Sequence, residues 1–258
     1  MKIIITFLLS LCVTSIYCEN NTVIIVDNQL VYASTSEISL YVQDKNVTSV
    51  APDAFHDLGD LFALVLNDNQ IKSFANGTFS YFSNMILLNV VNNKLKEIQD
   101  GLFDGLGDLS YLYLQKNEIT HIGKHAFVNL YSLRTLNLSK NKLTTLTQDF
   151  NHILSSVREF KFSWNQITHI DPYLFASNIS YYRIDLSHNN LSIIRSNMFY
   201  TLGEGLIVDL TYNDIKSIEP SAFTCLTWDI SFDPSVDVRR NSQPCWYEVK
   251  KYPFHMLN

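Results

Sequence analysis

The chain has 258 residues, of which 47% are apolar, 13% aromatic and 17% charged. This composition supplies ample material for a hydrophobic core and excludes an intrinsically disordered chain. The net charge of -6 is mild and no run of lysines and arginines stands out, so nucleic acid is not an expected partner.

Residues 1–18 have the pattern of a secretory signal peptide. Lys2 precedes an apolar stretch from Ile3 to Val13, and smaller, more polar residues follow. The stretch is short for a membrane span, which needs about 20 apolar residues, although an uncleaved anchor is an alternative. We predict cleavage after Cys18 and a secreted, extracellular product without a membrane span, because no second hydrophobic stretch follows.

Residues 19–36 are predicted to form an N-terminal cap. They contain two apolar runs, Val23 to Val26 and Leu30 to Tyr32. We expect these runs to lay a strand or a hairpin over the open core of the first repeat.

Residues 37–228 repeat with a period of 24 residues and divide into eight units. The unit that begins at Leu61 reads LFALVLNDNQIKSFANGTFSYFSN, and the unit that begins at Leu109 reads LSYLYLQKNEITHIGKHAFVNLYS. A unit this small cannot bury its own apolar face, but stacked units share one continuous core. The period therefore predicts a solenoid.

Within each unit, a short strand is followed by a buried asparagine. Leu112 and Leu114 are two residues apart, so both face inward while Tyr113 faces outward. Asn117 follows where the chain must turn while buried, and its amide can both donate and accept hydrogen bonds. We predict a structural ladder formed by Asn69, Asn93, Asn117, Asn141, Asn165, Asn189 and Asn213.

A phenylalanine recurs later in most units, where it is expected to fill the wide outer side of the coil. In the fifth unit Phe150 lies one place early, so we expect a local distortion there. The other members are Phe55, Phe79, Phe103, Phe127, Phe175, Phe199 and Phe223.

The shared pattern LxxLxLxxNxLxxIxxxxFxxLxx resembles the typical 24-residue class of extracellular leucine-rich repeat. The resemblance covers about residues 37–228. Within this class, the chain resembles the ectodomains of Toll and adhesion receptors and the secreted leucine-rich immune proteins of insects. It implies an α/β-type solenoid: a curved horseshoe with a concave parallel β-sheet and a mostly irregular convex side.

Residues 229–258 are predicted to form a C-terminal cap and tail. Cys225 and Cys245 remain after removal of the leader, and in an oxidising compartment we expect them to form one disulfide. Its loop of about twenty residues would contribute roughly 3 kcal/mol of stability. A metal site is the alternative, but two cysteines without neighbouring histidines do not complete a zinc shell.

No catalytic or cofactor motif is present, so we expect neither enzymatic activity nor a cofactor. His121 and His169 occupy the same place in two units, but those units are separated by roughly 10 Å, which is too far for one metal ion. We predict no metal site and interpret both as exposed loop histidines.

Six sequons mark glycosylation sites in a secreted protein. Asn137 lies between the inward residues Leu136 and Leu138, so a glycan there would stand in the middle of the concave face and divide it. The six positions are Asn20, Asn46, Asn76, Asn137, Asn178 and Asn190.

The outward strand positions of a curved solenoid are its expected interaction surface, since they are free of core duties. Two columns on this face carry an aromatic run, a basic patch and two following aspartates, which give the surface electrostatic polarity. Ordinary solvated strand residues are the alternative interpretation. The candidate partner-binding residues are Tyr113, Lys116, Lys140, Lys161, Trp164, Asp185, His188, Asp209 and Tyr212.

The sequence therefore predicts a binding protein. We expect the partner to be a protein ligand or another leucine-rich repeat protein, bound by the concave face. The resemblance suggests innate immune recognition as the setting. A secreted inhibitor of a target enzyme, or a component of cell adhesion or extracellular matrix, is the alternative.

Overall fold

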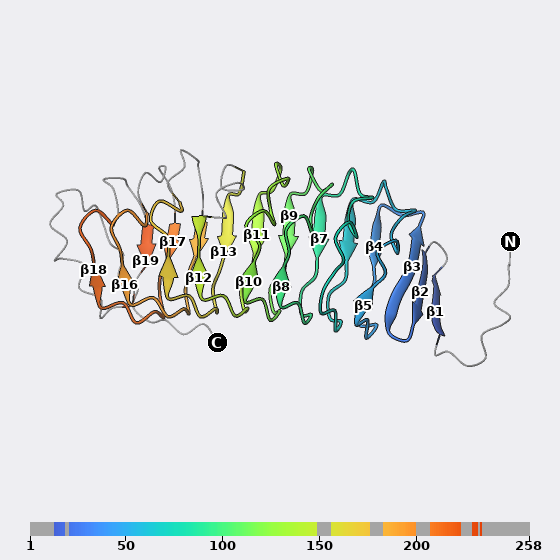
Figure 1. The fold of residues 1–258 in the computed structure, drawn as a ribbon, viewed down its shortest axis with the longest axis horizontal. Coiled ribbons are helices and arrows are strands. Elements are labelled where there is room, and N and C mark those ends of the chain that lie inside the picture. Colours follow the sequence, from blue (N-terminus) through green and yellow to red (C-terminus); the bar gives the residue numbers. More distant parts are fainter. Residues whose placement is uncertain are drawn as a thin grey trace.

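The computed structural model describes residues 13–18, 21–148, 156–175, 183–199, 207–222, 229–231 and 233. In this part of the chain, successive turns of about one repeat each stack side by side into an elongated solenoid (Figure 1). The 24-residue period predicts this arrangement, because equivalent residues of successive turns come to lie next to one another.

One long parallel sheet lines one side of the solenoid. Its strands have three residues each, and every neighbour in the sheet is the equivalent strand of the next turn. The strands, in chain order, are β4 (Ser39–Tyr41), β6 (Ala63–Val65), β7 (Leu87–Asn89), β9 (Tyr111–Tyr113), β11 (Thr135–Asn137), β13 (Glu159–Lys161), β15 (Arg183–Asp185), β17 (Ile207–Asp209) and β19 (Asp229–Ser231).

The strand register follows the sequence repeat. Leu112 of β9 lies opposite Leu136 of β11, and Leu136 lies opposite Phe160 of β13. All three side chains are 0% exposed, as the inward position of an alternating strand requires. The core is thus one column of buried side chains that runs through every described turn.

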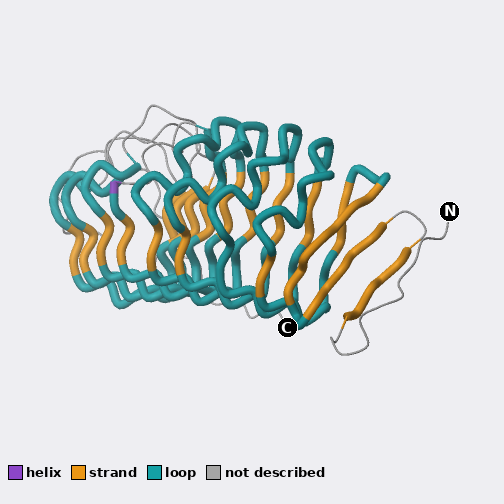
Figure 2. Tube along the Cα trace, turned by 45° about the vertical axis from the view of Figure 1, so that its right-hand side comes forward, coloured by secondary structure: helices purple, strands orange, loops and turns teal. Residues whose placement is uncertain are grey.

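The return side of the solenoid is mostly turns and loops (Figure 2). The residues described include no α-helix, and the one helical residue among them, Gln148, is in the 3₁₀ conformation. Short strands pair in parallel there, with two residues each. They are β8 (Glu97–Ile98), β10 (His121–Ile122), β12 (Thr145–Leu146), β14 (His169–Ile170), β16 (Ile193–Ile194) and β18 (Ser217–Ile218).

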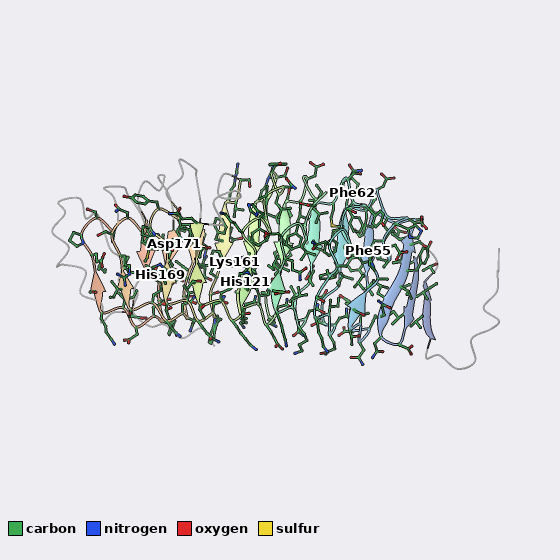
Figure 3. All side chains as sticks on the ribbon, viewed as in Figure 1. Phe55, Phe62, His121, Lys161, His169 and Asp171 are labelled. Atoms are coloured by element: carbon green, nitrogen blue, oxygen red, sulfur yellow. The ribbon has the colours of Figure 1, made fainter. Side chains whose placement is uncertain are left out.

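Stacked phenylalanines fill the coil between the sheet and the return side, as the side-chain view illustrates with Phe55 (Figure 3). The ring centroids of Phe79 and Phe103 are 6.2 Å apart, and those of Phe103 and Phe127 are 5.9 Å apart with planes inclined by only 7°. Offset stacking of this kind adds to the free energy of burying the rings.

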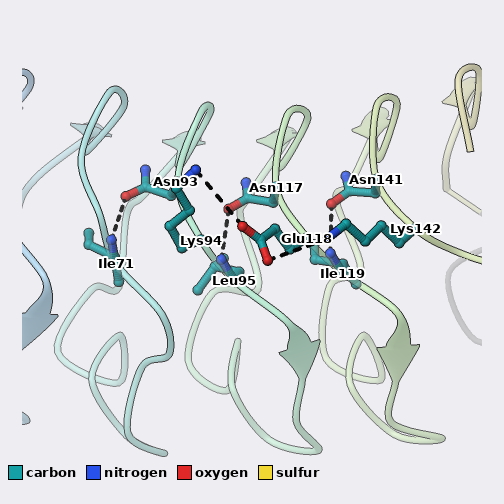
Figure 4. Close-up of polar contacts among 9 residues, drawn as sticks. All are labelled: Ile71, Asn93, Lys94, Leu95, Asn117, Glu118, Ile119, Asn141 and Lys142. Carbon is teal, nitrogen blue, oxygen red and sulfur yellow. Dashed lines mark hydrogen bonds and ion pairs between the residues drawn. The ribbon is translucent and has the colours of Figure 1, made fainter.

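The asparagines form a continuous ladder of hydrogen bonds. Asn117 Oδ1 accepts the backbone N–H of Leu95 at 3.0 Å, and its Nδ2 donates to Val90 O at 2.9 Å and Leu114 O at 3.0 Å. Asn141 repeats the pattern one turn later, on the N–H of Ile119 (Figure 4). Each side chain satisfies backbone groups that the sharp turn leaves without a β-ladder partner.

Beside the ladder, an exposed row of charges joins three turns. Glu118 receives Lys94 Nζ at 3.9 Å from one side and Lys142 Nζ at 3.4 Å from the other (Figure 4). Because the two lysines are exposed and Glu118 is only half-buried, such pairs contribute at most about 1 kcal/mol. The buried ladder is therefore expected to contribute more to the joining of the turns than this row does.

A small sheet covers the N-terminal end of the solenoid. β2 (Asn21–Val26) and β3 (Gln29–Thr35) form an antiparallel hairpin. β3 also pairs, in parallel, with β5 (Ser49–Val50) of the first repeat. On the outer side of β2 lies β1 (Val13–Cys18), antiparallel to it. β1 falls within the segment that we predict to be a signal peptide, and the position of cleavage remains a prediction.

The sheet continues beyond the last predicted repeat. β19 pairs in parallel with β17, with Asp229 opposite Ile207, although it lies in the segment assigned to the C-terminal cap. Asp233 then accepts the backbone N–H groups of Tyr212 at 2.9 Å and Asn213 at 3.2 Å. An aspartate carboxylate thus closes the turn at this end. The predicted disulfide of Cys225 and Cys245, like Phe150 and Phe223, lies outside the described residues.

Candidate protein-recognition surface

The outward face of the nine-stranded sheet, called the sheet face below, carries the predicted partner-binding residues. Tyr113 and Lys161 lie at the ends of β9 and β13, and Asn137 of β11 lies between them in the register. Asp185 and Asp209 follow on β15 and β17. All five side chains are half-buried, because each is flanked by the equivalent residues of two adjacent strands.

Three residues after the last strand position, the backbone of every repeat adopts the left-handed conformation. The φ angle is between 53° and 58° at all eight equivalent positions, none of which is glycine. In the first three repeats this position holds aspartate or asparagine, the residues that tolerate such angles best. In chain order the residues are Asp44, Asp68, Asn92, Lys116, Lys140, Trp164, His188 and Tyr212.

At the C-terminal end of this column, three aromatic rings form a stack. The centroids of Trp164 and His188 are 3.9 Å apart with planes inclined by 14°, and those of His188 and Tyr212 are 4.0 Å apart with planes inclined by 7°. Trp164 remains 53% exposed and Tyr212 49% exposed. We call these three residues the aromatic column. The spacing follows from the fold, because equivalent side chains of adjacent parallel strands are separated by about 4.8 Å.

Lys140 extends the aromatic column by one repeat. Its Nζ lies 5.6 Å from the centroid of the Trp164 ring, which is within the range of a cation–π contact. Lys116 precedes it in the same column and is exposed. The structure therefore joins four of the predicted residues into one row: a cation followed by three stacked rings.

The two aspartates serve the local fold. Asp185 Oδ1 accepts the N–H of Ser187 at 3.1 Å and its hydroxyl at 2.7 Å, and Asp209 does the same for Thr211. Asn137 makes the equivalent pair of bonds to Ser139. These side chains cap the turn after their strand, a role that short polar side chains commonly take.

Lys161 also has a partner on its own strand. Its Nζ lies 3.1 Å from Glu159 Oε1, and both side chains are about one third exposed. The polarity that the sequence suggests, lysines followed by aspartates, is therefore partly neutralised within the protein. What distinguishes this half of the sheet face is the aromatic column together with Lys116 and Lys140.

Sequence reasoning missed the first position of each strand. Residues two apart on a strand share a face, so Tyr111, Glu159, Arg183 and Ile207 point to the same side as the residues two places on. The Tyr111 and Tyr113 rings stack at 6.5 Å, and burial is the main cause that raises the pKa of the Tyr113 phenol above its ordinary value. The alternation that identified Tyr113 could have identified Tyr111 as well.

The candidate histidines lie on the return side and not on the sheet face. His121 is in β10 and His169 is in β14, which belong to different two-stranded sheets (Figure 3). His169 Nε2 lies 3.1 Å from Asp171 Oδ1. Within the described residues, no three histidine, cysteine, aspartate or glutamate side chains are grouped so that they could hold a metal ion.

Four of the six sequons lie in described parts of the chain. Asn46, Asn76 and Asn190 are exposed, whereas Asn137 is half-buried in β11. Asn137 lies beside Lys161 on the sheet face, so a glycan on it would stand one repeat from the aromatic column. Asn20 and Asn178 lie outside the described residues.

A family model, described as leucine rich repeat, matches the chain three times, over residues 39–95, 83–143 and 131–191. Together these matches run from residue 39 to residue 191, which is more than half of the 258 residues. The chain belongs to the leucine-rich repeat family. At the sequence level no curated protein matches this leucine-rich repeat protein.

Solved structures share the fold. A chain of the Drosophila Toll–Spatzle complex superposes with a TM-score of 0.65 at 20% identity, over 76% of this leucine-rich repeat protein and 27% of that chain. A chain of the octameric complex of Latrophilin 3, Unc5D and FLRT2 (LRR) gives 0.66 at 25% identity, over 76% and 60%. The leucine-rich repeat domain of APL1B gives 0.52 at 23% identity, over 75% and 68%.

These comparisons confirm the predicted fold class and the resemblance to Toll and insect leucine-rich proteins. This leucine-rich repeat protein spans only about a quarter of the Toll-complex chain that it matches, as the 27% coverage states. Among the described residues, no helix has the length and apolar character needed to cross a membrane.

Proposed function

We propose that this leucine-rich repeat protein acts outside the cell and binds a protein partner across the sheet face, with the aromatic column as its anchor. Exposed Trp and Tyr are the side chains that most often dominate binding energy in protein interfaces. The rings of Trp164, His188 and Tyr212 are already ordered by stacking. Little side-chain freedom is therefore lost when a partner binds.

The observation that carries the proposal is the backbone conformation beneath these rings. The repeat requires a left-handed residue here, and Asp44, Asp68 and Asn92 meet that requirement at low cost. Trp164 and Tyr212 adopt the same angles, with φ of 57° at each, although large side chains disfavour them. The fold needs no aromatic ring at this position, so we assign the rings to recognition.

The nature of the partner is supported by related complexes. Two of the similar structures, the Toll–Spatzle complex and the complex that contains FLRT2, are assemblies of proteins. A protein partner is therefore the ligand class that we propose for this chain. The immune setting remains a prediction from the sequence, as do secretion and glycosylation.

The test begins with capture and ends with an affinity. The purified protein is immobilised and exposed to its native extracellular fluid, and each recovered protein is then purified and titrated against it by calorimetry. We expect Trp164→Ala to weaken the interaction about tenfold or more. Tyr131→Ala is the matched control, because Tyr131 is 73% exposed and lies in the turn before β11 and not in a strand of the sheet.

The two variants must also be compared in stability. Trp164→Ala removes a surface stack, so the free energy of unfolding should change by no more than about 1.5 kcal/mol. A large loss of stability would assign Trp164 to packing instead. Equal affinities of the Trp164→Ala and Tyr131→Ala variants would refute the anchor role.

A further inference from the structure

The outer edge of the N-terminal cap is held by the segment that we predict to be removed. β1 pairs with β2 through six consecutive residue pairs, from Val13 opposite Val26 to Cys18 opposite Asn21 (right-hand end of Figure 1). The last residue of β1, Cys18, is also the residue after which cleavage is predicted. Cleavage there would remove β1 whole and leave the backbone groups on this edge of β2 without partners.

The residues of β2 itself do not protect the edge that would be exposed, although Asn20 just before the strand is a predicted glycosylation site. The strand reads NTVIIV, so it has no charged residue and no proline, and five β-branched residues follow one another from Thr22 to Val26. Proteins normally protect edge strands with charges, prolines or bulges. The one irregularity of β2 lies between Ile24 and Ile25 on the side of β3, whereas its register with β1 is unbroken.

We infer that in the processed protein the edge of β2 pairs, antiparallel, with β2 of a second copy of this chain. β1 pairs with this edge of β2 over all six residues, so the edge accepts an antiparallel strand over its full length. Two identical strands that pair antiparallel are related by a twofold axis, so the contact is self-complementary and closed. β2 has no charged side chain that the contact would have to desolvate. The flanking Asp27 residues of the two copies lie at opposite ends of the paired strands and so do not repel each other.

The dimer leaves both recognition surfaces available. β2 belongs to the cap sheet with β3 and β5, whereas the aromatic column lies on the nine-stranded sheet near the other end of the solenoid. Two copies joined at their caps would present two sheet faces, and a multivalent partner would be bound with gain in avidity. The pairing itself does not depend on the proposed function of the sheet face.

The test uses the protein secreted with its own leader and carrying Asn20→Gln, so that no glycan can stand beside the strand. N-terminal sequencing establishes where the chain starts, and sedimentation velocity at micromolar concentration gives the mass. We expect a chain that starts at Glu19 and a species of twice the monomer mass that dissociates on dilution. A monomer at every concentration, or a chain that still contains β1, would overturn the inference.

Matched variants locate the contact. Ile24→Lys places a charge in the middle of β2 and should raise the dimer dissociation constant at least about tenfold. Ile38→Lys makes the same exchange at a residue that is 65% exposed and lies just before β4, and it should leave the dimer unchanged. Equal effects of the two variants would place the contact elsewhere.

A third form of the protein keeps the test valid if the Ile24→Lys variant does not fold. A chain produced with another leader and starting at Val13 retains β1, with Cys18→Ser to prevent disulfide exchange. β1 then occupies the edge of β2, and we expect a monomer. A dimer that persists in this form would contradict pairing through β2.

Discussion

Replacement of Asn117 by alanine removes one rung of the asparagine ladder. The side chain is only 7% exposed and makes three hydrogen bonds to backbone groups. Val90 O keeps a bond from Asn93 Nδ2 at 3.3 Å, and Leu114 O keeps one from Asn141 Nδ2 at 3.0 Å. The Leu95 N–H, by contrast, loses the acceptor that it has in the structure.

The expected cost follows from this inventory. A buried donor left unsatisfied costs about 1–3 kcal/mol, and the two weakened carbonyl contacts together cost about 1 kcal/mol more. We therefore expect the free energy of unfolding to fall by roughly 2–4 kcal/mol. Urea unfolding followed by far-UV circular dichroism measures it. The control is Glu118→Ala at the next residue, which breaks two exposed ion pairs and should cost less than about 1 kcal/mol. Equal losses in the two variants would refute the claim that the ladder stabilises the turns more than the exposed ion pairs do.

Three further predictions test separate parts of the structure. Phe103→Ala should lower the free energy of unfolding by about 3–5 kcal/mol in the same assay, because the ring is 2% exposed and stacked on both sides. Lys116→Gly should raise the free energy of unfolding by about 1 kcal/mol, because glycine adopts the φ of 58° found there without strain. Lys96→Gly is the control: Lys96 is not among the residues with positive φ, so this change should lower the free energy of unfolding by a similar amount. The N–H of His125 donates to Asp100 and lowers the pKa of that carboxyl below its ordinary 3.8. The ionised Asp100 therefore stabilises the folded state above pH 3.8, and this stabilisation is lost as the pH falls through the lowered pKa. Asp100→Asn should therefore reduce the dependence of stability on pH in acid titrations, and an unchanged acid limb would contradict this assignment.

Much of the fold could be predicted because the repeat imposes one register on all its columns. Leu112, Leu114 and Asn117 have the inward positions that alternation and the 24-residue period require. The short strands of the return side were not predictable, because two residues such as Glu97 and Ile98 carry no alternating pattern. β19 was missed for another reason: it lies 22 residues after β17, not 24.

The sequence names the candidate surface residues but does not give their geometry. The column of Trp164, His188 and Tyr212 is visible in the sequence, but its stacking depends on a left-handed backbone that the sequence does not announce at bulky residues. Asp185 and Asp209 also have a local role that the sequence indicates. A serine or threonine two residues after Asp185 and Asp209 was a signal for a local turn, and the structure places Oδ1 of both carboxylates there.

The central claim is that the sheet face meets a protein partner, and cross-linking mass spectrometry in the native fluid tests it most directly. The lysines are built-in probes: Lys116 and Lys140 are exposed in the column that carries the aromatic rings, whereas Lys72 and Lys96 are exposed on the return side. Our account predicts intermolecular cross-links from Lys116 and Lys140 to a second protein. Cross-links confined to Lys72 and Lys96 would contradict it.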